Sequence, residues 1–440
     1  MASRGWGVRN SGAAVSAAVL AAMAVGGPVG TAGAETAGCE GPQWVSGWMA
    51  APSDTFGVAD PSMVPQVVVG GQTFRLIATP HRGGSEVRIH LSNQNRPVPV
   101  EFAHVTIAEQ AAGATVRADT VREVSFGGSS GVTVPAGGEV VSDPIALSFE
   151  AFQPLAVSVY APGLAVLPTE HFNANATSYY SLPLAGDAAA DPSGAALPLS
   201  TTSMPFLSGL DVRAPATVST IVAFGDSITD GYVGGTYLSV PQDPAVVDRN
   251  ARYPDFLQHR LDEAGLPFTV VNAGISGNRV TRDGLIPQFG PAGVARLQRD
   301  AVDRAGVSDV IVLEGINDLG VPIGVDYDQL VAGYTDLIAR LHAAGLAVHL
   351  GTLLPAGNAL TDGIATLPLA APVRQRVNAW IRSQTLSDSV IDFDAALRDP
   401  ADPEVLAPRY AGADNLHPNP AGYRAMAEAV DLSAFRGRCR

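Results

Sequence analysis

The hydrophobic pattern of this chain changes its period about halfway along the 440 residues. From about residue 44 to residue 180, short alternating apolar runs are separated by glycine, proline and aspartate. Beyond about residue 216, apolar strand-like runs alternate with longer stretches that carry apolar residues at helical spacing. Side chains repeat every two residues in a strand and every 3.6 residues in a helix. We therefore expect two regions of different architecture.

The first region reads as a series of short strands. Two alternating runs, at residues 74–79 and 86–91, flank the pair Gly83-Gly84, which predicts a hairpin turn between them. Many short strands without a helical period indicate an antiparallel β-sandwich, expected over residues 40–182. Such a domain is either a carbohydrate-binding module or a structural partner. We favour the structural role, because no exposed aromatic stripe can be identified in the sequence.

The second region predicts a parallel sheet. Its strand-like runs are separated by helical stripes and lie at residues 221–225, 268–271, 310–313, 347–353 and 390–393. Five strands alternating with helices predict an α/β fold, a doubly wound, flavodoxin-like sheet, over residues 216–436. The Ala- and Pro-rich residues 183–215 between the two regions are expected to form a linker or irregular connection.

A Gly225-Asp226-Ser227 turn ends the first of these strands and is a candidate site for a nucleophilic serine. A serine hydroxyl attacks an ester only with help from a base, an orienting acid and donors for the oxyanion. Asp414 lies three residues before His417, a spacing that lets the carboxylate accept the imidazole Nδ1 hydrogen. Taken alone, each motif also fits a polar turn or a helix cap.

Two further segments place small or amide-bearing residues after strands of the predicted sheet. Gly274 and Gly277 follow the second strand, and Asn317 follows the third. Ligands of open parallel sheets bind at the carboxyl ends of the strands, so these residues are candidates for the same site as Ser227.

The four motifs, in this order, resemble those of the SGNH, or GDSL-type, hydrolases. The resemblance implies that Ser227 is the nucleophile, His417 the base and Asp414 its orienting acid. It also implies an oxyanion hole formed by the N–H groups of Ser227 and Gly277 and the side-chain amide of Asn317, with Gly274 as a rival to Gly277. No cofactor is expected, and the scattered histidines show no metal-ligand spacing.

Further motifs resemble a two-domain secreted subgroup related to xylan esterases. These are residues 44–48, 134–144 and 391–400, which cover both predicted regions. The resemblance implies a serine esterase that removes acetyl groups from xylan or a related polysaccharide. The alternatives are a GDSL-type lipase or phospholipase acting on longer acyl chains and, in another class, a non-catalytic glycan-binding protein.

The N-terminus has the pattern of a signal peptide. Residues 1–34 carry Arg4 and Arg9, then an Ala-rich apolar run, then small residues, so cleavage is expected after Ala34 and the mature protein is expected to be secreted. The two cysteines, Cys39 and Cys439, would then lie near the ends of the mature chain, where a disulfide is the favoured interpretation.

Charge narrows the class of partner. The formal net charge of −15 disfavours nucleic acid and anionic membrane surfaces, which would repel the chain. No apolar run reaches the length of a membrane span. The expected partner is a neutral ester substrate, an acetylated polysaccharide or a small acyl ester, and the sequence does not fix the oligomeric state.

Overall fold

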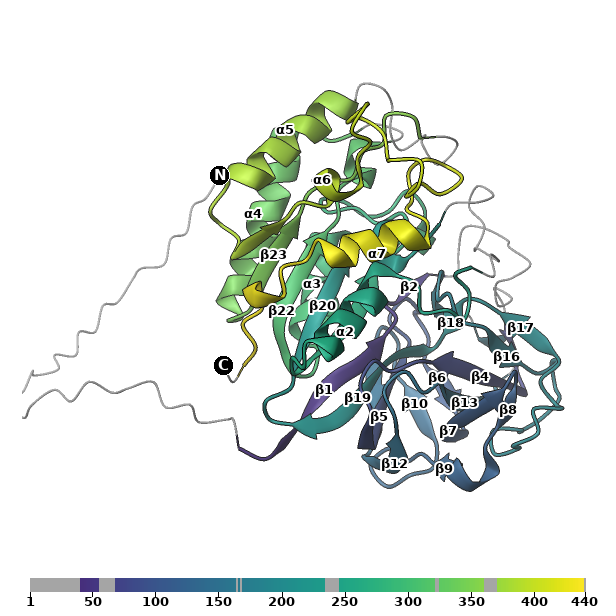
Figure 1. Cartoon of the computed structure of the whole chain (residues 1–440). Coiled ribbons are helices and arrows are strands. Elements are labelled where there is room, and N and C mark those ends of the chain that lie inside the picture. The colour runs from purple at the N-terminus through teal and green to yellow at the C-terminus, as the bar shows by residue number, and fades with distance from the viewer. Residues whose placement is uncertain are drawn as a thin grey trace, which may run out of the picture. The chain divides into compact units, whose positions relative to one another are not determined.

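The structure, a computed structural model, describes residues 40–54, 68–163, 165–166, 168–233, 245–320, 324–359 and 370–438 (Figure 1). These residues all belong to one compact unit. The expected signal peptide at residues 1–34 and both cysteines, Cys39 and Cys439, lie outside the described residues. Cleavage after Ala34 and the disulfide therefore stay predictions, as does the division into separate domains.

The second region contains the predicted five-stranded sheet. Its strands are β20 (Ser219–Gly225), β21 (Phe268–Gly274), β22 (Val307–Leu313), β23 (Ala347–Gly351) and β24 (Ser389–Ile391). They pair in the order β21-β20-β22-β23-β24, and every pair is parallel. All the carboxyl ends therefore meet at one edge of the sheet. The prediction of a parallel sheet is confirmed.

Helices cover both faces of this sheet. They are α1 (Ser227–Asp230), α2 (Tyr253–Glu263), α3 (Gly293–Leu297), α4 (Tyr327–Ala343), α5 (Ala370–Ser383), α6 (Phe393–Leu397) and α7 (Pro420–Glu428). Alternate residues of β20 enter different cores: Ile221 packs with α2 and α7, whereas Val222 packs with α4 and α5. Figure 1 shows α4 and α5 together and α2 beside α7.

The first region consists mostly of strands. They are β1 (Pro42–Met49), β2 (Ser53–Asp54), β3 (Val68–Val69), β4 (Gln72–Ala78), β5 (Gly84–Ser92), β6 (Val100–Phe102), β7 (His104–Ala112), β8 (Thr115–Val116), β9 (Arg122–Glu123), β10 (Val132–Val134), β11 (Glu139–Val141), β12 (Ile145–Phe149), β13 (Leu155–Ala161), β14 (Ala165–Val166), β15 (Thr169–His171), β16 (Ser178–Tyr180), β17 (Leu199–Thr201), β18 (Met204–Pro205) and β19 (Leu207–Pro215). One antiparallel sheet is built on β1, β19 and β5, and another on β16, β4, β13 and β7. Both sheets contribute to one apolar core, an arrangement consistent with a β-sandwich.

The predicted hairpin at Gly83-Gly84 is wrong. Strand β4 belongs to one sheet and β5 to the other, so the intervening residues carry the chain between sheets. A Cβ atom on Gly83 would lie 2.6 Å from the carbonyl oxygen of Phe149. The glycine therefore permits close backbone packing at the crossover and does not form a two-residue turn.

The connection expected at residues 183–215 is partly regular structure. It contains β17, β18 and β19, and β19 lies between β1 and β5 in the sheet. The alternating pattern is hidden there because polar residues of β19 are buried as well. Asp211 is 2% exposed and accepts hydrogen bonds from Arg88 and His90.

The strand-rich region also contributes to the core beside the parallel sheet. Met49 and Ala51, at and just beyond the end of β1, belong to the same buried cluster as Val222 and Phe224 of β20. Nearby, the Ser46 carbonyl accepts a hydrogen bond from the Thr269 hydroxyl of β21 at 3.2 Å. The two regions therefore share apolar core.

Candidate active site

Ser227 lies at the first position of α1, directly after β20. The Asp226 side chain caps this one-turn helix by accepting a hydrogen bond from the Ile228 N–H at 3.0 Å, and Gly231 ends the helix with a left-handed φ of 94°. The first N–H groups of a helix have no acceptor within the helix. The Ser227 N–H is therefore placed to serve a ligand at the carboxyl end of the sheet.

Two glycines allow α1 to sit tightly over the ends of the neighbouring strands. A Cβ atom on Gly225 would lie 2.1 Å from the Leu313 carbonyl oxygen, and one on Gly274 would lie 2.3 Å from the Asp230 nitrogen. No side chain larger than hydrogen fits at either position. This close packing fixes the height of the Ser227 hydroxyl above the sheet.

Ser227, His417 and Asp414 form one hydrogen-bonded array. The Ser227 Oγ lies 2.7 Å from His417 Nε2, and the other ring nitrogen, Nδ1, lies 2.6 Å from Asp414 Oδ2. The second oxygen of Asp414 accepts from the backbone N–H groups of Leu416 and His417, both at 2.9 Å. All three catalytic candidates are buried, and Ser227 keeps 6% of its surface exposed.

The electrostatics of this array keep Asp414 ionised. Burial opposes the charge on this carboxylate, but the hydrogen bond and the charge of His417 outweigh it and hold the pKa of Asp414 well below its usual range. The Tyr232 ring lies edge-to-face on the His417 ring, with 4.7 Å between centroids. The imidazole is therefore held on one side by a carboxylate and on another by an aromatic ring.

The expected oxyanion donors lie on two adjoining segments. Gly277 adopts a left-handed φ of 78° just after β21, and Asn317 begins a short 3-10 helix after β22. The Asn317 amide donates to the Asn278 carbonyl at 2.9 Å, which ties the two segments together. The N–H of Gly274 donates to Asn272 Oδ1 at 2.9 Å, which favours Gly277 over Gly274 as a donor. Their role toward an oxyanion stays a prediction.

Asp318 reinforces this connection. Its carboxylate accepts from the Val280 N–H at 2.7 Å, from the Thr281 N–H at 3.0 Å and from the Thr281 hydroxyl at 2.7 Å. Asp318 follows Asn317 directly, so these bonds fix the segment that carries the predicted amide donor.

Sequence reasoning missed Arg296, which is 1% exposed beneath the site. Its guanidinium donates to the carbonyls of Gly225 at 2.8 Å and Ala273 at 2.7 Å and to Asn278 Oδ1 at 2.8 Å. It thereby links the ends of β20 and β21 to the segment after Gly277. Arg296 stands off the apolar stripe that Val294 and Leu297 define in α3, so the helical period gave no signal for it.

Two of the buried acids near this guanidinium have raised pKa values. Burial raises the pKa of Glu314 to about 8 and that of Asp226 to about 7. Each carboxyl therefore carries a proton for part of the neutral pH range. The Arg296 charge, which lies 3.4 Å from Glu314 Oε1, opposes the upward shift of the Glu314 pKa.

His171, from the strand-rich region, reaches the other end of α1 and was also missed. Its Nε2 lies 3.0 Å from Asp230 Oδ1, and its Nδ1 lies 2.9 Å from the Ala51 carbonyl oxygen. The other oxygen of Asp230 accepts from the N–H and hydroxyl of Ser276, at 3.0 and 2.6 Å. Asp230 therefore joins α1, the residue before Gly277 and the strand-rich region.

Within the described residues, no group of three or more His, Cys, Asp or Glu side chains is arranged to hold a metal ion. Helices in the same part of the chain are too short or too polar to cross a membrane.

Part of the chain matches a known protein family. Residues 223–425 match the model of the GDSL-like Lipase/Acylhydrolase family. No curated protein sequence matches the chain.

Solved structures similar to this chain align with about half of it. A carbohydrate acetylesterase, Est24 from Sinorhizobium meliloti, is 14% identical, with 48% of this chain and 95% of that chain covered and a TM-score of 0.37. The M. smegmatis aryl esterase is 17% identical, with 48% and 95% covered and a TM-score of 0.37. A GDSL-like lipase from Bacteroides thetaiotaomicron is 18% identical, with 49% and 87% covered and a TM-score of 0.34.

The matched span contains the Gly225-Asp226-Ser227 turn, both predicted oxyanion segments and the Asp414–His417 pair. Residues 223–425 therefore have the pattern of the GDSL-like Lipase/Acylhydrolase family, and the chain is a carboxylic ester hydrolase.

Proposed function

We propose that this chain is a secreted carbohydrate acetylesterase that uses Ser227, His417 and Asp414. The observation that carries the proposal is the continuous contact from Asp414 through His417 to the Ser227 hydroxyl. With Nδ1–H donated to Asp414, Nε2 is left as an acceptor for the Ser227 proton. This is the arrangement that a hydroxyl nucleophile requires.

The reaction then proceeds in two halves. Ser227 Oγ attacks the carbonyl carbon of the ester as His417 Nε2 takes the hydroxyl proton, and His417 returns that proton to the leaving alcohol. Water attacks the resulting acyl-serine with the same assistance, releasing the carboxylic acid and restoring Ser227. Asp414 stays ionised throughout and stabilises the imidazolium that forms in each half.

The oxyanion of each tetrahedral intermediate is assigned to three donors. They are the N–H groups of Ser227 and Gly277 and the Asn317 amide. Preorganised donors of this kind typically lower the barrier by about 3–4 kcal/mol each. The bonds of Asn317 to Asn278 and of Asp318 to Thr281 support the assignment, because they fix the donor segments before substrate binds.

The acetylated-polysaccharide substrate is supported by the motifs shared with xylan esterases at residues 44–48, 134–144 and 391–400. The net charge of −15 also agrees with a neutral polymer in preference to an anionic lipid surface. Secretion is supported by the pattern of residues 1–34, and a bridge between Cys39 and Cys439 accords with an oxidising compartment.

The decisive experiment compares substrates on the purified protein. Initial rates are measured on p-nitrophenyl acetate, butyrate, octanoate and palmitate, and acetate release is measured from acetylated xylan. We expect the highest kcat/KM on acetate and release of acetate from the polysaccharide. Activity confined to octanoate and longer esters would instead assign the protein as a lipase, and inactivity on every ester would favour a glycan-binding role.

A further inference from the structure

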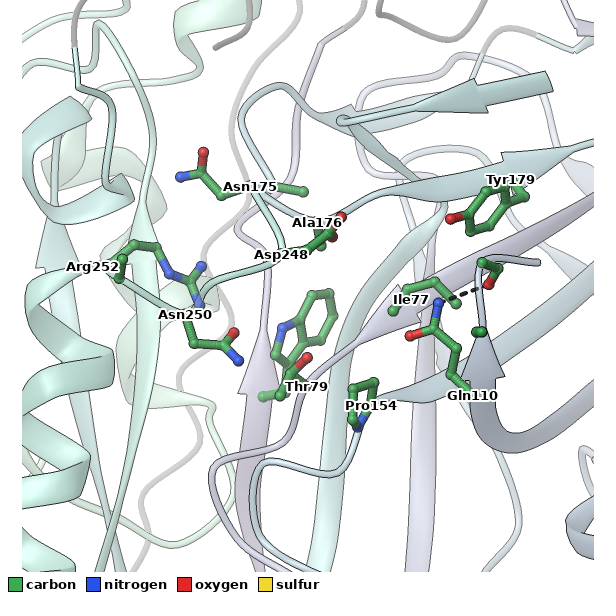
Figure 2. A pocket seen from close by; sticks show the side chains of 15 residues that line it. Ile77, Thr79, Gln110, Pro154, Asn175, Ala176, Tyr179, Asp248, Asn250 and Arg252 are labelled. Carbon is green, nitrogen blue, oxygen red and sulfur yellow. Dashed lines mark hydrogen bonds between the residues drawn. The ribbon is translucent and has the colours of Figure 1, made fainter. Parts of the chain in front are cut away.

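A cavity of about 290 Å³ lies between the strand-rich region and the residues that precede α2 (Figure 2). Its size is near the lower end of the range for ligand pockets. Figure 2 shows Asn250 and Arg252 on one side, Gln110 and Tyr179 on the other, and Thr79 between them. None of these residues belongs to the catalytic array described above.

The charged groups of this cavity already have partners. Arg252 forms a two-pronged ion pair with Asp255, with both contacts at 2.8 Å. The Asp248 carboxylate accepts from the backbone N–H and the hydroxyl of Thr177, both at 2.7 Å. The Arg252 charge is therefore balanced by Asp255 and the Asp248 carboxylate is held by two hydrogen bonds, which leaves an uncharged, hydrogen-bonding ligand as the best fit.

The remaining polar groups suit a ligand rich in hydroxyls. Gln110 and Asn250 carry amides with both donors and acceptors, and Thr79 and Tyr179 carry hydroxyls that serve as either. Gln110 donates one hydrogen to the Gly113 carbonyl at 2.8 Å, which orients its amide at the rim. A ligand hydroxyl both donates and accepts hydrogen bonds. The amides and hydroxyls that line this cavity can serve as partners for both.

Aromatic surface accompanies these polar groups. Trp48 and Tyr179 both line the cavity. An aromatic ring packs well against the C–H face of a sugar ring, while neighbouring polar groups bind its hydroxyls. An acyl chain in the same space would offer no hydrogen-bond partner to the Asn250 amide or to the remaining donor and acceptor of Gln110, which disfavours an apolar ligand.

The cavity adjoins the helix that carries the nucleophile. Asn175, which lines it, donates to the Gly231 carbonyl at 3.1 Å, at the end of α1. A Cβ atom on Gly231 would lie 2.2 Å from the Arg252 side chain. Two lining residues therefore contact the residue that ends the Ser227 helix.

We propose that this cavity binds a neutral saccharide unit of the polymer, separate from the unit that carries the reacting ester. The inference rests on the proposed polysaccharide substrate and adds a binding site in the strand-rich region. Binding energy from such a remote unit holds the polymer while the ester reacts at Ser227. Small esters that lack a second sugar unit gain nothing from it.

The test uses xylohexaose and mannohexaose as unacetylated probes. Binding is measured by calorimetry in the Ser227→Ala protein and in the same protein carrying Gln110→Ala with Tyr179→Phe. The matched control carries Gln298→Ala with Tyr160→Phe, at positions outside the cavity lining. Thr79→Val serves as a second cavity variant, and melting temperatures verify that each protein is folded.

We expect at least one probe to bind, and the cavity double variant to raise its Kd about tenfold or more, the loss of roughly two hydrogen bonds. The control should stay within twofold. The same cavity substitutions are then made in the active enzyme, which keeps Ser227. There they should raise KM for acetylated xylan and leave kcat/KM on p-nitrophenyl acetate unchanged. No binding of either probe, or equal Kd in cavity and control variants, would overturn the proposal.

The two proposals fail in different ways. A wild-type enzyme that releases no acetate from acetylated xylan contradicts the proposed substrate, whatever the calorimetry shows. A wild-type enzyme that deacetylates xylan while the cavity variants behave as the control contradicts only the saccharide site.

Discussion

Two buried histidine–aspartate pairs flank α1, and they differ in what faces the second ring nitrogen. In the catalytic array, His417 Nδ1 meets Asp414 and Nε2 meets the Ser227 hydroxyl, which can give up a proton. At the junction with the strand-rich region, His171 places both nitrogens against acceptors: the Ala51 carbonyl and the Asp230 carboxylate. The same pair of residue types therefore suits the proposed base in one place and, with an acceptor at each ring nitrogen, favours a protonated ring in the other.

The protonation of His171 follows from these partners. Burial disfavours its charge, but the charge and hydrogen bond of Asp230 and the Ala51 carbonyl outweigh that cost and raise the pKa of His171. A doubly protonated ring satisfies both acceptors, whereas a neutral ring leaves one facing a lone pair. Catalysis requires the opposite at His417, where one nitrogen must be free of a proton.

The largest expected effect is on the nucleophile. Ser227→Ala should lower kcat by a factor on the order of 10³–10⁶, because no other group takes over the attack. The melting temperature should stay close to that of the wild type, since the side chain is small and its hydroxyl contacts His417 Nε2. Rates on p-nitrophenyl acetate measure the effect. Retention of wild-type activity would show that another residue is the nucleophile.

The second-largest loss of rate is expected for substitutions of Asp414 and His417. Asp414→Asn should lower kcat roughly 10²–10⁴-fold, because the amide favours the wrong tautomer of His417. His417→Ala should cost more, since it removes the base itself. A smaller loss in His417→Ala than in Asp414→Asn would contradict the order of roles drawn from the geometry.

Activity and stability should move in opposite directions as pH rises. The value of kcat/KM should increase about tenfold per pH unit below the pKa of His417 in the free enzyme, because the base must be neutral.

The expected fall in stability comes first from His90. Burial opposes the charge of this ring, but Asp211 and Glu139 outweigh it and raise the pKa of His90 to about 9. The stability that its charge provides is complete below about pH 6.5 and is lost as pH approaches 9.

The pH prediction is checked by rate profiles and by thermal melts across pH 6–9. His171 adds to the fall in stability, because its folded-state pKa is also raised. A melting temperature that rises steadily over this range would contradict the charged state assigned to the two histidines.

The smallest effect on the catalytic rate is expected for a substitution of His171, at the junction with the strand-rich region. Its main effect should be on stability. His171→Phe leaves Asp230 buried without its cation and should destabilise the fold by about 3–5 kcal/mol. His342→Phe is the matched control: its ring is 40% exposed beside Asp388, so the loss should be at most about 1 kcal/mol. Denaturant unfolding compares the two. Equal stability losses would show that the junction pair has no special role.

The sequence predicted the parallel sheet and the residues of the array because each is signalled locally. Ser227 follows an apolar strand, and Asp414 and His417 are three residues apart, so short motifs carry both facts. The carboxyl ends of parallel strands then meet at one edge, and the structure brings Ser227 within 2.7 Å of His417.

The junction could not be predicted in the same way. His171 and Asp230 are 59 positions apart and belong to regions of different architecture, so no motif joins them. Arg296 was hidden because its partners are mostly backbone carbonyls, which any sequence supplies. Strand β19 was missed because a central strand buries polar side chains such as Asp211 when they find partners.

The shared core beside β20 bears on how this enzyme can be divided. Met49 and Ala51 pack in the same cluster as Val222 and Phe224. A gene fragment beginning near residue 216 would encode the whole catalytic array yet leave part of that sheet face bare to water, a surface prone to aggregation. We therefore expect such a fragment to need either the end of β1 or polar replacements on the exposed sheet face to stay in solution.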